Sequence, residues 1–170
     1  MAAGSTYSQI ATTTTSGNQT SVTFSSIPQT YTNLVLIVGN VKHSYAGSGA
    51  VFDAFLRFNS DTATNYSGTY LEGDGSSVLS ERNSNRTSIS SIFPMASAGP
   101  GNIIANIQSY SNATTYKTVL MRGNVSAGNV AGIAGLWRST AAITSLTCIL
   151  SGSYYYIDGS VFTLYGIKGA

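Results

Sequence analysis

The chain has few charged side chains. Only 8% of its 170 residues are Asp, Glu, Lys or Arg, against about 25% in an average soluble domain. Six acids, eight bases and one histidine are spread over the whole length. Most enzyme mechanisms need clustered ionisable groups that move protons or bind metal ions. The scarcity of charge therefore argues against an enzyme and favours a protein that acts through contacts of its surface.

A basic stripe, the usual signature of nucleic-acid binding, is also missing. The lysines and arginines stand apart along the sequence, except for the loose pair Arg82 and Arg86. We therefore expect no nucleic-acid partner.

Cysteine and long apolar runs are equally scarce. Cys148 is the single cysteine, so no disulfide can form within the chain, which suits folding in a reducing cytoplasm. The apolar neighbours Leu146, Ile149 and Leu150 predict that Cys148 is a small buried side chain. No apolar run approaches the roughly 20 residues that cross a bilayer. The first residues lack the basic and apolar regions of a signal peptide, so we expect neither a membrane partner nor a cleaved leader.

What the chain does contain is alternation of apolar and polar residues, the period of β-strands. Leu34–Val38 is a continuous apolar run and predicts a central strand buried on both faces. Ten segments in all are predicted to be strands: Tyr7–Ala11, Ser21–Phe24, Leu34–Val38, Phe52–Phe58, Thr87–Ile92, Ile103–Tyr110, Lys117–Asn124, Val130–Trp137, Ile143–Leu150 and Val161–Ile167.

Many short strands separated by Gly- and Asn-rich turns favour an all-β fold. We predict a two-sheet antiparallel β-sandwich, jelly-roll-like, with about 8–10 strands. Residues 1–170 are expected to form one domain, in which residues 1–20 are an N-terminal arm or an edge hairpin.

The acids are poor candidates for chemistry. Glu72 and Asp74 are the only close pair, and their Glu-Gly-Asp-Gly setting is more typical of a tight turn than of a hydrolytic site. Asp61, between Asn59 and Asn65, resembles a calcium loop but lacks the required glycine and final acid, so an Asx-turn is preferred. No catalytic residue, metal ligand or cofactor site is predicted.

Aromatic residues provide the surface candidates. Alternation should turn at least one ring of Tyr154, Tyr155 and Tyr156 outward, close to Asp158. Exposed tyrosines provide contact area for a sugar or for a neighbouring subunit, and both interpretations stay open.

Three further residues complete the list of candidates. His43 has no acid or cysteine nearby in sequence, so a loop histidine without a role is the preferred interpretation, and it is kept with Tyr45 as a surface candidate. Trp137 is interpreted as an anchor of the core.

Four stretches occur in a fixed order along the chain: Ile27–Leu36, Leu56–Asp61 with Asn65–Ser67, Gly135–Leu146, and Leu164–Ile167. Together they resemble small structural proteins from the virions of tailed bacteriophages, common among phages of aquatic bacteria and including cyanophages. The resemblance covers about Val22 to Ile167. It implies a β-sandwich component of the particle, a homotrimer or part of a fibre, without catalytic residues.

The leading hypothesis is a non-enzymatic capsid decoration (cement) protein that bridges neighbouring capsomers. Its partners would be further copies of itself, as a homotrimer, and the major capsid protein, on the surface of a virion assembled in the host cytoplasm. Low charge agrees with this role because the cores of protein interfaces are depleted in charged residues. The alternative is a tail-fibre or spike head domain that binds host-surface glycan through its tyrosines. A glycan-degrading enzyme ranks last.

Overall fold

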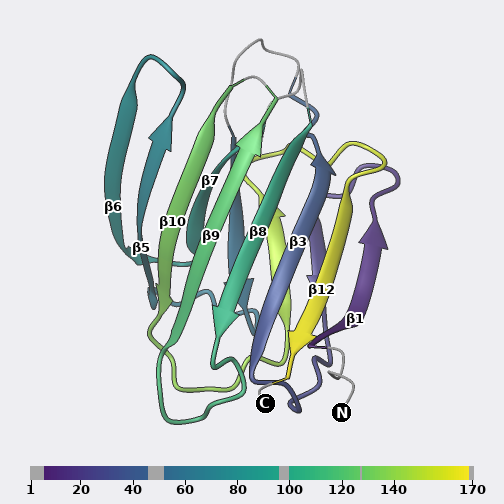
Figure 1. The fold of residues 1–170 in the computed structure, drawn as a ribbon, viewed down its shortest axis with the longest axis vertical. Coiled ribbons are helices and arrows are strands. Elements are labelled where there is room, and N and C mark those ends of the chain that lie inside the picture. The colour runs from purple at the N-terminus through teal and green to yellow at the C-terminus, as the bar shows by residue number, and fades with distance from the viewer. Residues whose placement is uncertain (1–5, 46–51, 96–99, 127, 169–170) are drawn as a thin grey trace.

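A computed structural model describes residues 6–45, 52–95, 100–126 and 128–168, and this part of the chain forms twelve strands and no helix. The strands make two antiparallel sheets that pack face to face (Figure 1). The predicted all-β, two-sheet sandwich is therefore confirmed, with more strands than expected. The larger sheet contains, in spatial order, β1 (Tyr7–Thr14), β12 (Val161–Ile167), β3 (Asn33–Val41), β8 (Gly101–Gln108), β9 (Lys117–Val125), β10 (Val130–Trp137), β5 (Tyr66–Gly73) and β6 (Val78–Arg86). The smaller sheet contains β2 (Ser21–Phe24), β11 (Leu146–Leu150), β4 (Phe52–Phe58) and β7 (Ile89–Met95).

Eight of the strands have jelly-roll connectivity. β1 pairs with β12, β2 with β11, β3 with β8, and β4 with β7. These four pairs are the arms of one long antiparallel hairpin, and its first four strands alternate between the two sheets. A hairpin folded over in this way is the topology of jelly rolls, so the predicted jelly-roll-like order is present.

Two hairpins are added to this scaffold. β5–β6 follows β4, β9–β10 follows β8, and both join the edge of the larger sheet beside β8 (Figure 1). The sequence predicted β9 and β10 but not β5 and β6. β6 is exposed along almost its whole length, so it shows no alternation of apolar and polar residues. It is a strand because its backbone pairs with β5.

The core lies between the two sheets, where alternate residues of each strand point inward. β8, β9 and β10 show regular alternation between buried and solvent-facing residues. Trp137 is buried, as predicted, and stacks on Tyr66 with ring centroids 6.1 Å apart. The ring centroids of Phe58 and Trp137 are 5.5 Å apart, so three aromatic residues pack together at one end of the core.

The central position of β3 is confirmed, but its burial on both faces is only partial. Leu34, Leu36 and Val38 point into the core, and Val35 is buried on the other face. Ile37, also on that face, is 37% exposed. The prediction failed at Ile37 because no further layer of the described chain covers this side of the larger sheet.

Residues 7–14 form the edge strand β1, and β1 and β2 belong to different sheets. These two strands therefore do not form a hairpin with each other. Residues 1–5 of the predicted arm lie outside the described residues.

Candidate functional site

The structure brings together aromatic candidates that lie far apart in the sequence. The backbone N–H of Ser44 donates to the Tyr155 carbonyl at 3.0 Å, and the Tyr155 N–H donates to the Ser44 hydroxyl at 3.1 Å. The Tyr156 N–H donates to the Gln19 carbonyl at 2.8 Å. The tyrosine triplet is therefore held between the segment that follows β3 and the turn before β2.

Tyr156 is not a surface residue, which corrects the prediction. Only 1% of it is exposed, and its ring packs edge to face on Phe162 with ring centroids 5.0 Å apart. Isolated bridges to Gln19 and His43 fix its backbone at the end of the sandwich and direct the ring into the core. Its hydroxyl is buried with no hydrogen-bond partner in the described protein, and burial raises its pKa well above the usual 10.0.

His43 is also buried, with 0% exposure, so it is not the surface candidate that was predicted. Its Nδ1 accepts a hydrogen bond from the Tyr45 backbone N–H at 3.1 Å. The backbone bridge between His43 and Tyr156 holds His43 inside the protein. His43 is therefore a buried structural residue at this end of the sandwich.

The other candidates keep part of their surface in solvent. Tyr45, Tyr154 and Tyr155 are half-buried, and Asp158 is exposed in the turn that leads to β12. The rings of Tyr45 and Tyr154 meet edge to face at 5.3 Å. The structure thus makes one small aromatic cluster of Tyr45 and Tyr154, while Tyr155 flanks it through the backbone bonds to Ser44.

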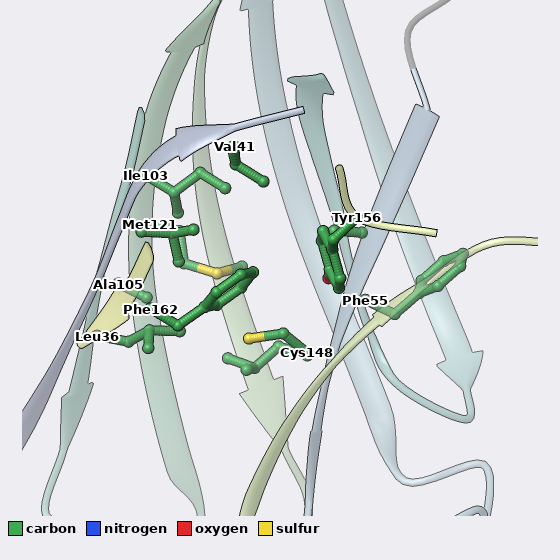
Figure 2. Close-up of a pocket in the computed structure, with 12 residues that line it drawn as sticks. Leu36, Val41, Phe55, Ile103, Ala105, Met121, Cys148, Tyr156 and Phe162 are labelled. Carbon is green, nitrogen blue, oxygen red and sulfur yellow. The ribbon is translucent and has the colours of Figure 1, made fainter. Parts of the chain in front are cut away.

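A small apolar cavity lies between the sheets beneath Tyr156. Figure 2 shows Tyr156 across this cavity from Ile103 and Met121, with Cys148 and Phe162 also lining it. Its volume of about 20 Å³ is enough for one water-sized sphere. Burial raises the pKa of the Cys148 thiol to about 12, so this cysteine is an inert core residue, as predicted.

Of the paired acids, Asp74 shapes the hairpin between β5 and β6, and Glu72 links β5 to the turn between β9 and β10. Asp74 Oδ1 accepts from the backbone N–H groups of Ser76 and Ser77 at 2.8 and 2.6 Å, and these bonds lower the pKa of its carboxyl. Glu72 Oε1 accepts from the Asn129 side-chain amide at 2.8 Å. The predicted turn is confirmed, and both carboxylates have structural partners.

Asp61 forms the predicted Asx-turn. Its Oδ1 accepts from the Ala63 backbone N–H at 2.9 Å. Its Oδ2 accepts from Asn65 Nδ2 at 3.0 Å and from Trp137 Nε1 at 2.8 Å. The carboxylate therefore ties the loop after β4 to the aromatic end of the core.

The largest feature that the sequence did not predict is the outer face, meaning the side of the larger sheet turned away from the smaller sheet (Figure 1). Eight large apolar residues are exposed in the described chain, and six of them point from this face. The strand registers place them on one side of the sheet. They are Tyr7, Ile37, Leu71, Val78, Leu120 and Val130.

The outer face is nearly free of charge. Among its described positions only Arg82 and Arg122 carry a charge, and none is an acid. A hollow of about 510 Å³ opens on it between Arg82, Leu120 and Leu136, above the small side chain of Ala134. The sequence indicates this face only through apolar residues on both sides of several strands. Which of these residues share one side of the sheet depends on how the strands pair.

The described residues contain no group of three His, Cys, Asp or Glu side chains suited to hold a metal ion. In the same part of the chain there is no helix long and apolar enough to cross a membrane.

Comparison with known proteins identifies no family: neither a family model nor a curated protein matches the chain. One solved structure, a protein of unknown function from Shewanella oneidensis MR-1, aligns with 98% of this chain and 77% of its own length. The two share 6% sequence identity with a TM-score of 0.20, a similarity too low to support a conclusion about fold or function.

Proposed function

We propose that this chain is a non-enzymatic structural protein of a tailed-bacteriophage virion, and that it decorates the capsid by docking its outer face across neighbouring capsomers. The observation that carries this proposal is the apolar, nearly uncharged outer face. Exposed large apolar side chains that gather on one face mark a surface that another macromolecule covers.

The size of the outer face suits a stable contact. Eight strands about 4.8 Å apart, each with seven or more residues rising about 3.3 Å, correspond to a projected area of about 800 Å². A standard protein interface buries about 800 Å² on each partner. The outer face alone could therefore supply one complete side of such an interface.

The composition of the face supports a protein partner. Tyrosine, leucine and isoleucine are interspersed with Asn106, Gln108 and Thr118, which can donate and accept hydrogen bonds. Because few charges need to lose water, docking carries little desolvation cost. The jelly-roll topology agrees with this role, since viral capsid proteins commonly have it, although the fold alone does not define a function.

In this proposal the protein acts as a homotrimer on the virion surface, with the major capsid protein as its partner and without a cofactor. The homotrimer follows from the sequence resemblance. A catalytic role is not proposed because Glu72, Asp74 and Asp61 are each engaged in hydrogen bonds that shape loops.

The test is binding of the purified protein to capsids that lack it. We expect Leu120→Glu, which places a charge at the centre of the outer face, to weaken binding by at least about tenfold, because docking would remove the new carboxylate from water. Leu79→Glu is the matched control: Leu79 is 52% exposed but points from the opposite side of β6. Equal binding of the two variants would contradict the proposal.

Copy number in purified particles provides a second test. A number comparable with that of the major capsid protein supports decoration, whereas a much smaller number would place the protein in the tail and contradict the proposal.

A further inference from the structure

A second surface hollow lies on the other side of the sandwich, where β4 meets the turn between β6 and β7. It has a volume of about 300 Å³ and is lined by Phe55, Arg57, Asn85, Arg86, Thr87 and Ser88. Two of the eight bases of this sparsely charged chain therefore line one hollow. Neither the surface candidates nor the outer face includes these residues.

Strand geometry aims the side chains into this hollow. Phe55 and Arg57 alternate with the buried residues Ala54, Leu56 and Phe58, so they point away from the core. Figure 2 shows the Phe55 ring directed away from the internal cavity. Arg86 pairs with the inward-facing Tyr66, which places Arg86 on the side of β5–β6 that faces β4.

The polar groups of the hollow are prepared to donate hydrogen bonds. Arg57 Nε donates to the Thr87 carbonyl at 3.2 Å, which holds the guanidinium in place and leaves its two terminal amino groups for a ligand. Arg86 is exposed to solvent. The side chain of Thr87 contributes a hydroxyl at the rim.

Asn85 is oriented by a third arginine. Arg138 Nη2 donates to Asn85 Oδ1 at 3.0 Å and to the Thr64 carbonyl at 2.9 Å. With its oxygen engaged, the Asn85 amide has its NH₂ group to donate. Asn85 also has a φ of 54°, a left-handed conformation that asparagine tolerates better than most residues.

Among the side chains that the structure describes, the carboxylate that acts on Arg57 belongs to Asp61 and is already engaged in hydrogen bonds. Asp61 lies close enough for the Arg57 charge to contribute to lowering its pKa. Its oxygens, however, accept hydrogen bonds from Ala63, Asn65 and Trp137. The described lining of the hollow therefore carries positive charge, which suits an external anion.

We propose that this hollow binds an acidic sugar residue. The guanidinium groups of Arg57 and Arg86 would bind its carboxylate, a pairing favoured by the planar geometry of both partners. The Asn85 amide and the Thr87 hydroxyl would bind ring hydroxyls, and the Phe55 ring would pack on the apolar side of the pyranose. A volume of about 300 Å³ is at the small end of ligand sites and suits one sugar residue. This inference does not depend on the proposed capsid role.

The test is a titration of the full chain with D-glucuronate, followed by two-dimensional amide NMR. We expect saturable shifts of the amides of residues 55–57 and 85–88 with a Kd in the millimolar range, and little change with D-glucose. An absence of shifts up to about 50 mM glucuronate, well above a millimolar Kd, would overturn the proposal.

Two further ligands separate an acidic sugar from other anions. Inorganic phosphate and a penta-glutamate peptide are expected to bind more weakly than glucuronate, since they cannot use Phe55 and the hydroxyl-binding groups. Equal or tighter binding of either would show a general anion site or a peptide site and would overturn the assignment to sugar.

Variants locate the site. Arg86→Gln, at an exposed position, is expected to fold normally and to weaken glucuronate binding about tenfold, because charge-assisted hydrogen bonds are lost. Arg122→Gln is the control, since Arg122 is exposed on the outer face. An unchanged Kd for Arg86→Gln, or the same loss in Arg122→Gln, would contradict the proposal.

Discussion

At the scale of single residues, the Asp61 carboxylate links its own loop to Trp137 on a distant strand. Burial alone would raise the pKa of its carboxyl, but hydrogen bonds from Asn65, Trp137 and Ala63 outweigh burial. The Arg57 charge acts in the same direction, so the pKa of Asp61 lies below its usual 3.8. The sequence predicted the bond from Asp61 to its own loop, because an Asx-turn is local. The bond from Trp137 was not predictable, since this donor comes from a distant strand.

We predict that Asp61→Asn lowers the free energy of unfolding by about 1–2 kcal/mol near neutral pH, since a partly solvated carboxylate loses its charge-assisted bonds. Because folding lowers the pKa of Asp61, its stabilisation is present above the ordinary pKa of 3.8 and is lost as the pH falls through the lower folded value. Urea unfolding of both proteins at a pH of about 7 and of about 2.5 checks this. A difference of the same size at both pH values would contradict the assignment.

The same scale explains why two surface candidates were wrong. Local alternation indicated that part of the tyrosine triplet faces solvent, and this holds for Tyr154 and Tyr155. Tyr156 and His43 are buried because each bridges a segment far away in sequence. No local pattern contains such a bridge.

At the scale of elements, β10 contains two glycines that lie on opposite sides of the sheet. Gly135 points toward the core, where a Cβ atom would lie 2.8 Å from Ile89 Cγ2 on β7. Gly132 points to the outer face, where a Cβ atom would meet nothing within 4 Å. The two glycines therefore have different roles although they are three residues apart.

We predict that Gly135→Ala lowers the free energy of unfolding by about 1–3 kcal/mol, because the added methyl group overpacks the contact between the sheets. Gly132→Ala should stay within about 0.5 kcal/mol of the parent protein. Chemical unfolding of both variants measures the difference. If both changed stability equally, backbone entropy rather than packing would be the cause.

Strands with one buried face were predictable, and β2, β4, β10 and β12 have the predicted bounds. β11 begins at Leu146, later than predicted, since Ile143 lies in the loop before it. β5 and β6 were missed because β6 has no buried face. A strand of this kind depends on its neighbour in the sheet.

At the scale of the whole molecule, the low charge of the chain is reflected in the composition of its outer face. Within the part of the chain that the structure describes, one broad side of the eight-stranded sheet is uncovered, and this side carries two arginines and no acid. In the proposed role, apolar and neutral polar contacts dominate the docking energy. Ionic strength screens interactions between exposed charges, but it hardly changes apolar contacts.

We therefore predict that retention on capsids changes by less than about twofold between low and moderate salt, as expected for a contact with little electrostatic energy. Sedimentation of decorated particles through buffers of increasing NaCl, with the released protein quantified, measures this. Steep release at moderate salt would indicate a contact based on ion pairs and would contradict the proposed docking face.

The sequence by itself determined the all-β class, the two sheets, most of the strands and the burial of Cys148 and Trp137. These features follow from alternation and composition within short windows of the chain. The extent of the outer face, the burial of His43 and Tyr156, and the meeting of Arg57 with Arg86 in one hollow depend on contacts between distant segments. Tertiary structure decides such features because strand pairing selects which residues share a face, and pairing partners here are separated by up to about the length of the chain.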